Sequence, residues 1–132
     1  MQPKDQNSRN SNSILFSLIV FLMLTIGCAN SAQEFFKSIM IPVRDGTNLA
    51  TDLYFPSSKL DSYPVILMRT PYSKKLLKEY GVFYSKQGYV TAIQDVRGKY
   101  DSEGDWTPYK TEGKDGYDVI EWLASQKWSN GK

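Results

Sequence analysis

One tyrosine in this chain sits where its hydroxyl could take part in catalysis. Tyr72 ends an Arg-Thr-Pro-Tyr sequence at positions 69–72, directly after a short apolar run. A tyrosine hydroxyl keeps its proton at neutral pH and can donate a hydrogen bond to an oxygen that gains negative charge during acyl transfer. The same pattern also fits an aromatic ring packed beside a proline, which is the commoner role. From the residues alone, both roles for Tyr72 remain open.

A second polar cluster follows the next apolar run, from Asp95 to Asp105. In open α/β sheets, ligands bind outside the carboxyl ends of the strands, so this position is a candidate site edge. The residue types favour a structural role instead, with an ion pair between Asp95 and Arg97 and turns at glycines. We therefore predict that Asp95, Arg97 and Gly98 shape the loop at the strand end.

Several kinds of site are disfavoured by what the 132 residues contain. There is no histidine, so these residues cannot form a Ser-His-Asp or Cys-His site, and no Gly-x-Ser-x-Gly sequence occurs. The acids between Asp101 and Glu112 have the spacing of a calcium-binding EF-hand loop, but Trp106 stands where that loop needs glycine. We predict no metal and no cofactor. A net charge of +2 without a basic stripe predicts no nucleic-acid partner.

The first 32 residues have the pattern of an export signal. A polar start precedes an apolar run at 14–26, which is shorter than the roughly 20 residues of a membrane span. Two cleavage sites fit: before Cys28, as in a bacterial lipoprotein with a lipid on that cysteine, or near Ala32. We predict a signal peptide at 1–32 and an exported protein, periplasmic or extracellular, whose membrane contact would be the lipid anchor.

The remaining chain, 33–132, has the pattern of one α/β domain. Strands are predicted at 36–43 and 48–55, joined by an Asp-Gly turn, and at 64–69 and 89–95; helices are predicted at 73–87, capped by Ser73, and at 112–126. The run at 64–69 is apolar enough for a strand buried on both faces. Leu76, Leu77, Tyr80, Phe83 and Tyr84 follow helical spacing in the first helix, and Val119, Ile120, Leu123 and Ala124 are expected to point inward from the second. An antiparallel hairpin followed by a parallel strand-helix-strand-helix is how an α/β-hydrolase fold begins.

Taken together, the motifs resemble the X-Pro dipeptidyl-peptidase-like hydrolases, a group that includes cocaine esterase, α-amino acid ester hydrolases and glutaryl acylases. The resemblance runs from about residue 39 to 132. Its pieces are Pro-Val-Arg-Asp-Gly at 42–46, Arg-Thr-Pro-Tyr at 69–72, Gln-Asp-Val-Arg-Gly-Lys-Tyr at 94–100, Ser-x-Gly at 102–104, Glu-Trp at 121–122 and Gln-x-Trp-x-Asn-Gly at 126–131.

The resemblance implies an exported serine hydrolase that cleaves small-molecule esters, amides or peptides. In that family a tyrosine at the position of Tyr72 is an oxyanion donor, and the serine, aspartate and histidine map beyond Gly131. We therefore expect these residues to be the first part of the hydrolase domain, ending before the nucleophile elbow, and to be inactive alone. Within the group, a dipeptidyl peptidase and an ester or β-lactam-type acylase both remain open. The alternative from another class is a non-catalytic exported lipoprotein built on part of the hydrolase fold.

Overall fold

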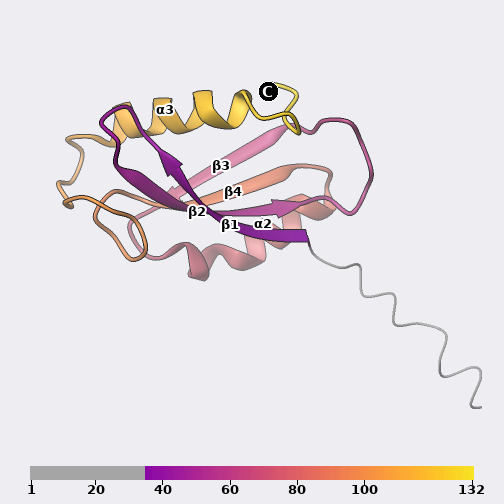
Figure 1. The fold of residues 1–132 in the computed structure, drawn as a ribbon. Coiled ribbons are helices and arrows are strands. Elements are labelled where there is room, and N and C mark those ends of the chain that lie inside the picture. Colours follow the sequence, from indigo (N-terminus) through magenta and orange to yellow (C-terminus); the bar gives the residue numbers. More distant parts are fainter. Residues whose placement is uncertain (1–34) are drawn as a thin grey trace, which may run out of the picture. The chain divides into compact units, whose positions relative to one another are not determined.

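A computed structural model of the protein describes residues 35–132, which form a four-stranded sheet with a helix on each face (Figure 1). The elements are β1 (Phe35–Pro42), β2 (Asn48–Phe55), β3 (Val65–Thr70), the 3₁₀ helix η1 (Lys74–Leu77), α2 (Lys78–Lys86), β4 (Val90–Asp95) and α3 (Glu112–Ala124). The predicted signal peptide and Cys28 lie outside the described residues. None of the helices within residues 35–132 has the length and apolar composition of a membrane span.

The hairpin of β1 and β2 forms as predicted. The strands pair antiparallel from Phe35 opposite Phe55 to Pro42 opposite Asn48. Gly46 adopts a φ of 83° in the connecting turn and donates its N–H to the carbonyl of Val43 at 2.8 Å. Glycine takes this left-handed conformation without steric cost, so the Asp-Gly pair sets the register of the two strands.

The sheet has the order β1-β2-β4-β3, with β4 antiparallel to β2 and parallel to β3. All six residues of β4 are buried, because strands flank it on both sides and helices cover both faces. The apolar run of β3, predicted to be buried on both faces, is only half-buried from Val65 to Arg69. The reason is topological: β3 lies at one edge of this sheet.

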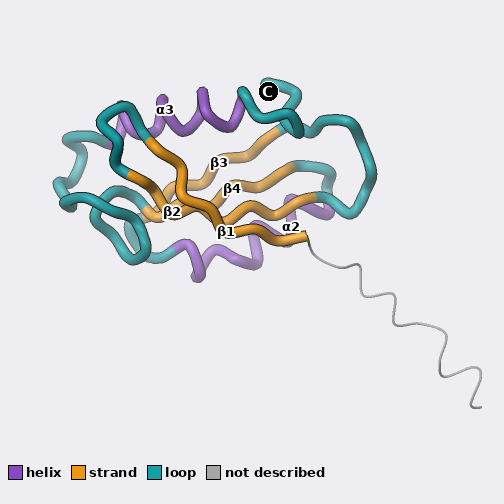
Figure 2. Tube along the Cα trace, in the orientation of Figure 1, coloured by secondary structure: helices purple, strands orange, loops and turns teal. Residues whose placement is uncertain are grey.

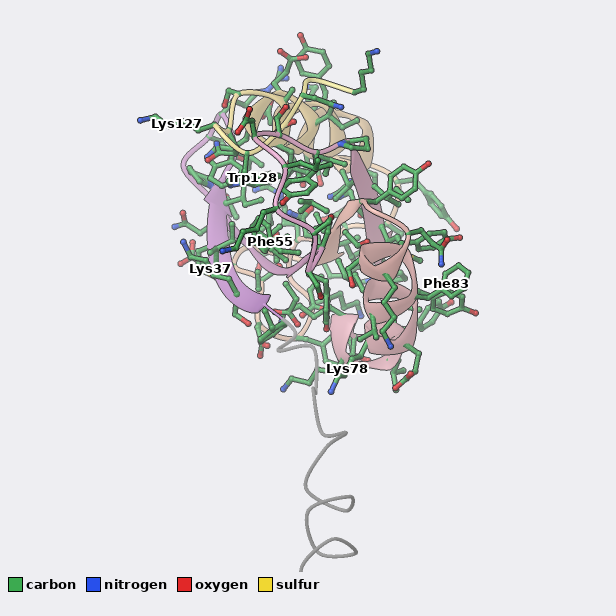
Figure 3. All side chains as sticks on the ribbon, turned by 90° about the vertical axis from the view of Figure 1, so that its right-hand side faces the viewer. Lys37, Phe55, Lys78, Phe83, Lys127 and Trp128 are labelled. Carbon is green, nitrogen blue, oxygen red and sulfur yellow. The ribbon has the colours of Figure 1, made fainter. Side chains whose placement is uncertain are left out.

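The main apolar core lies between the sheet and α3. Its buried members are Ile41, Val43, Leu49, Leu53, Ala92, Val119 and Leu123. Phe55 and Trp128 close one end of this core edge-to-face, with ring centroids 5.3 Å apart (Figure 3). The inward prediction was wrong for Ile120 and Ala124, both of which are exposed, since the buried face of α3 turns through Asp115, Val119 and Leu123.

The opposite face of the sheet is covered by α2, which approaches closely at a glycine. A Cβ added to Gly81 would lie 2.5 Å from a ring carbon of Tyr54 on β2. Only Gly81 and Ser85 are buried in α2, whereas Phe83 points outward (Figure 3). The predicted cap is also wrong: Ser73 has a φ of 80° and makes no side-chain capping bond, and the first turn is 3₁₀.

Residues 128–132 lie along the start of β3. Ser129 forms a parallel bridge with Tyr63, and the N–H of Val65 donates to the carbonyl of Lys132 at 2.8 Å. These residues therefore begin parallel pairing at the edge of the sheet where β3 starts.

Candidate functional site

The two parallel strands end side by side, and the loops that follow them meet at one end of the sheet (Figure 2). Thr70 pairs with Asp95 as the last residue of each strand, and the N–H of Val96 donates to the carbonyl of Thr70 at 3.1 Å. The loop 71–73 and the long loop 96–111 therefore start from the same point, the edge where ligands bind in α/β sheets.

Tyr72 lies on the first of these loops with its side chain accessible. Its N–H donates to Thr70 Oγ1 at 3.0 Å, which folds the backbone back onto the strand end. The residue is 72% exposed, so the described part of the chain does not bury it as a core aromatic. Pro71 before it restricts the backbone, which limits the directions the phenol can take.

 The cavity beside Tyr72 has a volume of about 400 Å³. It is lined by Arg69, Pro71, Tyr72, Val96, Trp106, Pro108, Tyr109 and Glu112. Trp106 and Tyr109 bring aromatic surface to it from the long loop, so its wall is largely apolar.

One ion pair lies in the lining of this cavity. Arg69 Nη1 is 2.9 Å from Glu112 Oε2 and also donates to the Glu112 carbonyl at 2.8 Å, while Arg69 Nε donates to Gln94 Oε1 at 2.8 Å. The two charges offset each other, so this pair leaves no net charge in a wall that is otherwise largely apolar. Glu112 was predicted at the start of a helix and at the end of the acidic spacing that begins at Asp101. Its pairing with Arg69 depends on a contact that no local pattern indicates.

Asp95 is fully buried at the end of β4, and its partners differ from the prediction. Its Oδ1 accepts the N–H of Lys74 at 2.7 Å, and its carbonyl accepts the hydroxyl of Ser102 at 2.6 Å. The predicted ion pair with Arg97 was wrong: the strand ends at Asp95, and in the loop that follows Arg97 pairs with Asp45 and Asp115, whereas Asp95 pairs with Lys74. Asp95 instead ties the loop after β3 to the loop after β4.

Arg97 connects the long loop to two distant elements. It donates to both carboxylate oxygens of Asp115 on α3, at 2.9 and 2.7 Å, to Thr47 Oγ1 at 2.7 Å, and it pairs with Asp45 at 2.9 Å. The hydrogen bond to Asp115 contributes most to raising the pKa of Arg97. The hydrogen bond from Arg97, followed by the N–H of Thr47, lowers the pKa of Asp45 to about 2. Asp115 lies in the first turn of α3, where the helix dipole also favours an acid.

Gly98 and Gly104 fit the tight path of the same loop. Gly98 has a φ of 66°, and a Cβ there would lie 2.2 Å from the backbone nitrogen of Trp106. Gly104 has a φ of 84°, with Arg97 Cγ 2.9 Å from where a Cβ would be. Any other residue at Gly98 would force the loop backbone apart. Among the residues that the structure describes, no group of acids, histidines or cysteines could hold a metal ion.

The sequence that forms these strands and loops matches a known protein family. Residues 45–132 match the family described as X-Pro dipeptidyl-peptidase (S15 family). The chain belongs to this family. The resemblance inferred from the sequence motifs is thereby confirmed, and so is the α/β fold with its mixed sheet.

Relatives of the S15 chain include ester hydrolases. It is 35% identical over 106 residues to cocaine esterase from Rhodococcus sp. (strain MB1 Bresler), covering 72% of this chain and 17% of that protein. Its fold is similar to that of an α-amino acid ester hydrolase, with a TM-score of 0.64 and 32% identity, covering 80% of this chain and 21% of the other. A CocE/NonD family hydrolase from Staphylococcus aureus has a TM-score of 0.63 at 29% identity, covering 73% and 21%. The chain thus spans about a fifth of the length of these relatives.

Proposed function

We propose that the protein containing these residues is a serine hydrolase that cleaves ester, amide or peptide bonds through an acyl-enzyme, with Tyr72 as an oxyanion donor. The observation that carries this proposal is the position of Tyr72. Its exposed side chain follows β3, at the shared carboxyl end of two parallel strands and beside a cavity of about 400 Å³. In α/β-hydrolases the loop after this strand contributes to the oxyanion hole.

The proposed chemistry uses the phenol as a fixed donor. When the serine attacks, the substrate carbonyl oxygen gains negative charge, and a hydrogen bond from Tyr72 strengthens as that charge develops. Binding of the uncharged ground state gains much less, so the effect falls on the chemical step. The ion pair of Arg69 and Glu112 leaves no net charge in the lining, which suits a neutral acyl group.

The nucleophile and the base of this mechanism are assigned to the rest of the protein. The 132 residues contain neither histidine nor a Gly-x-Ser-x-Gly sequence, and the relatives are about five times longer. We therefore propose that these residues supply the oxyanion donor and are inactive alone. The names of two relatives, cocaine esterase and α-amino acid ester hydrolase, favour esters over Xaa-Pro peptides as substrates.

The test is Tyr72→Phe in the full-length enzyme, which keeps the ring and removes the donor. We expect kcat on a p-nitrophenyl ester to fall by roughly 10²–10³, about 2.7–4 kcal/mol, with little change in KM. The matched control is Tyr80→Phe, an exposed tyrosine on α2, which should leave kcat unchanged. A kcat for Tyr72→Phe within about twofold of wild type would remove the oxyanion role. Absence of serine-inhibitor-sensitive hydrolysis by the full-length protein would favour the non-catalytic lipoprotein.

We also propose that residues 1–32 direct export and are removed. The support is the apolar run at 14–26 followed by Cys28 and small residues. The intact mass of protein recovered from the producing cell should correspond to a lipidated start at Cys28 or an unmodified start near Gln33. Recovery of the form that starts at Met1 from the cytosol would contradict this.

A further inference from the structure

A buried lysine follows the proposed oxyanion donor by two residues. Lys74 is 4% exposed, and its ammonium lies among three carboxylates. Nζ is 2.6 Å from Asp101 Oδ2, 3.7 Å from Asp52 Oδ1 and 3.7 Å from Asp95 Oδ2. These acids come from β2, the end of β4 and the long loop, so a single cation links three separate parts of the chain to the start of η1.

The cost of burying this cation is offset by its partners. Burial acts to lower the pKa of Lys74, but the hydrogen bond to Asp101 and the charges of Asp52 and Asp95 raise it overall. Lys74 is therefore charged at neutral pH. A buried charge cluster contributes less net stability than apolar packing of similar volume. The role of this cluster is therefore sought in the backbone that it fixes.

The cluster holds the backbone on one side of a strained residue. Ser73 has φ 80° and ψ 120°, a conformation that non-glycine residues rarely adopt. After it, the N–H of Lys74 donates to Asp95 Oδ1 at 2.7 Å; before it, the N–H of Tyr72 donates to Thr70 Oγ1 at 3.0 Å. Strain of this kind persists only where surrounding contacts over-determine the backbone, and it concentrates at functional sites.

We propose that Lys74 is a positioning residue for Tyr72. Its ammonium and its backbone N–H fix the chain directly after the tyrosine, so that the phenol remains aimed at the reacting carbonyl oxygen. The inference rests on the proposed oxyanion role of Tyr72. Lys74 itself touches no substrate in this scheme, since its charge is already paired with the three acids.

The distance dependence of the hydrogen bond sets the expected effect. An oxyanion donor works within about 2.7–3.1 Å of the charged oxygen, and a misplacement of about 1 Å can cost roughly 10²-fold in rate. Lys74→Met keeps the length of the side chain and removes the cation. We expect kcat of the full-length enzyme to fall roughly 10- to 100-fold with KM nearly unchanged. The matched control, Lys75→Met, changes an exposed lysine in the same 3₁₀ turn and should keep kcat within about twofold of wild type.

A double-mutant cycle separates positioning from general destabilisation. If Lys74 acts through the Tyr72 hydroxyl, adding Lys74→Met to Tyr72→Phe should lower kcat by less than about twofold, because no donor is left to misplace. If the two losses multiply, Lys74 is only structural and the inference is wrong. If Tyr72→Phe alone keeps normal kcat, the oxyanion role of Tyr72 is wrong. This outcome is distinct from the one that refutes only the positioning role of Lys74.

Two further variants cover the case in which Lys74→Met does not fold. Asp101→Ala removes the closest partner of the ammonium from a side chain that is 51% exposed. It should lower kcat roughly 3- to 10-fold, again with little added loss in the Tyr72→Phe background. Lys74→Arg, which keeps the charge, should retain more activity than Asp101→Ala. Unchanged kcat in Asp101→Ala, or a loss that multiplies with that of Tyr72→Phe, would overturn the proposal.

Discussion

Replacing Gly81 by alanine tests whether close packing of α2 on the sheet outweighs helix propensity. Gly81 lies within α2 with an ordinary helical backbone, so alanine carries no penalty of conformation there. Propensity alone predicts that Gly81→Ala stabilises the protein by about 0.8–1 kcal/mol. The added methyl, however, would lie 2.5, 2.6 and 2.8 Å from three ring atoms of Tyr54.

The steric cost of the added methyl should exceed the gain in helix propensity. Ordinary contacts of this kind begin at 3.4 Å, so the helix and the ring would have to separate by about 0.9 Å at the closest point. Tyr54 is only 4% exposed, which leaves its ring little room to move. Overpacking of a buried site costs about 1–3 kcal/mol, so we expect a net destabilisation of about 1 kcal/mol, with a range of about 0–2 kcal/mol. In a domain of about 150–250 residues, 1 kcal/mol corresponds to a fall in Tm of about 2–4 °C, and the shift is smaller in a larger domain.

The assay is thermal unfolding of the full-length protein, with hydrogen exchange of peptides covering α2 to localise the effect. The matched control is Gly113→Ala in α3, where the added methyl meets no atom within 4 Å and propensity should stabilise by up to about 1 kcal/mol. The two substitutions should therefore shift stability in opposite directions. A Tm for Gly81→Ala equal to or above that of Gly113→Ala would show that the ring of Tyr54 yields without cost and would refute the reasoning.

Two predictions concern the charged side chains around the long loop. Arg97→Met should lower the free energy of unfolding, measured in urea, by about 3 kcal/mol, because it leaves the buried carboxylate of Asp115 without its cation. The control Arg44→Met breaks a pair on an exposed arginine and should lower the free energy of unfolding clearly less. Equal decreases for the two variants would contradict the argument. The folded-state pKa of Asp45 is lowered to about 2, so its contribution to stability is present above pH 4 and is lost as the pH falls toward 2. Asp45→Asn should therefore reduce stability at pH 7 and flatten the decline between pH 4 and pH 2; a stability curve parallel to that of wild type would exclude this role.

Local patterns predicted most of the fold. The hairpin, the strand 48–55 and the long loop were predictable because alternation, an Asp-Gly turn and glycine-rich polar stretches depend on neighbouring residues. The sheet order and the exposure of β3 depend on which strands meet across the chain, and no local period carries that information. The same limit applies to α2, whose buried face consists of Gly81 and Ser85 and not of its apolar residues.

The candidate site, like the fold, could be predicted from the sequence only in part. The position of Tyr72 after a strand was readable, since an apolar run ending in Arg-Thr-Pro-Tyr marks the strand end. Its supporting contacts were not, because Lys74 and Asp115 meet their partners across 21 and 18 residues. A lysine at a polar helix start, such as Lys74, and an acid near a helix N-terminus, such as Asp115, are both usually exposed. Their burial therefore cannot be predicted from the neighbouring residues.

Two charged clusters, one around Arg97 and one around Lys74, hold the loops at the carboxyl ends of β3 and β4. Arg97 joins the long loop to the hairpin and to α3, whereas Lys74 joins the loop after β3 to β2 and to the same long loop. Both loops that border the cavity are therefore held by directional, long-range ion pairs, and apolar packing is concentrated elsewhere, under α3. Directional bonds fix the angle of a loop more closely than apolar contacts, which tolerate sliding. The backbone of Tyr72 is held between these fixed points while its side chain stays exposed, which is what the proposed donor role requires.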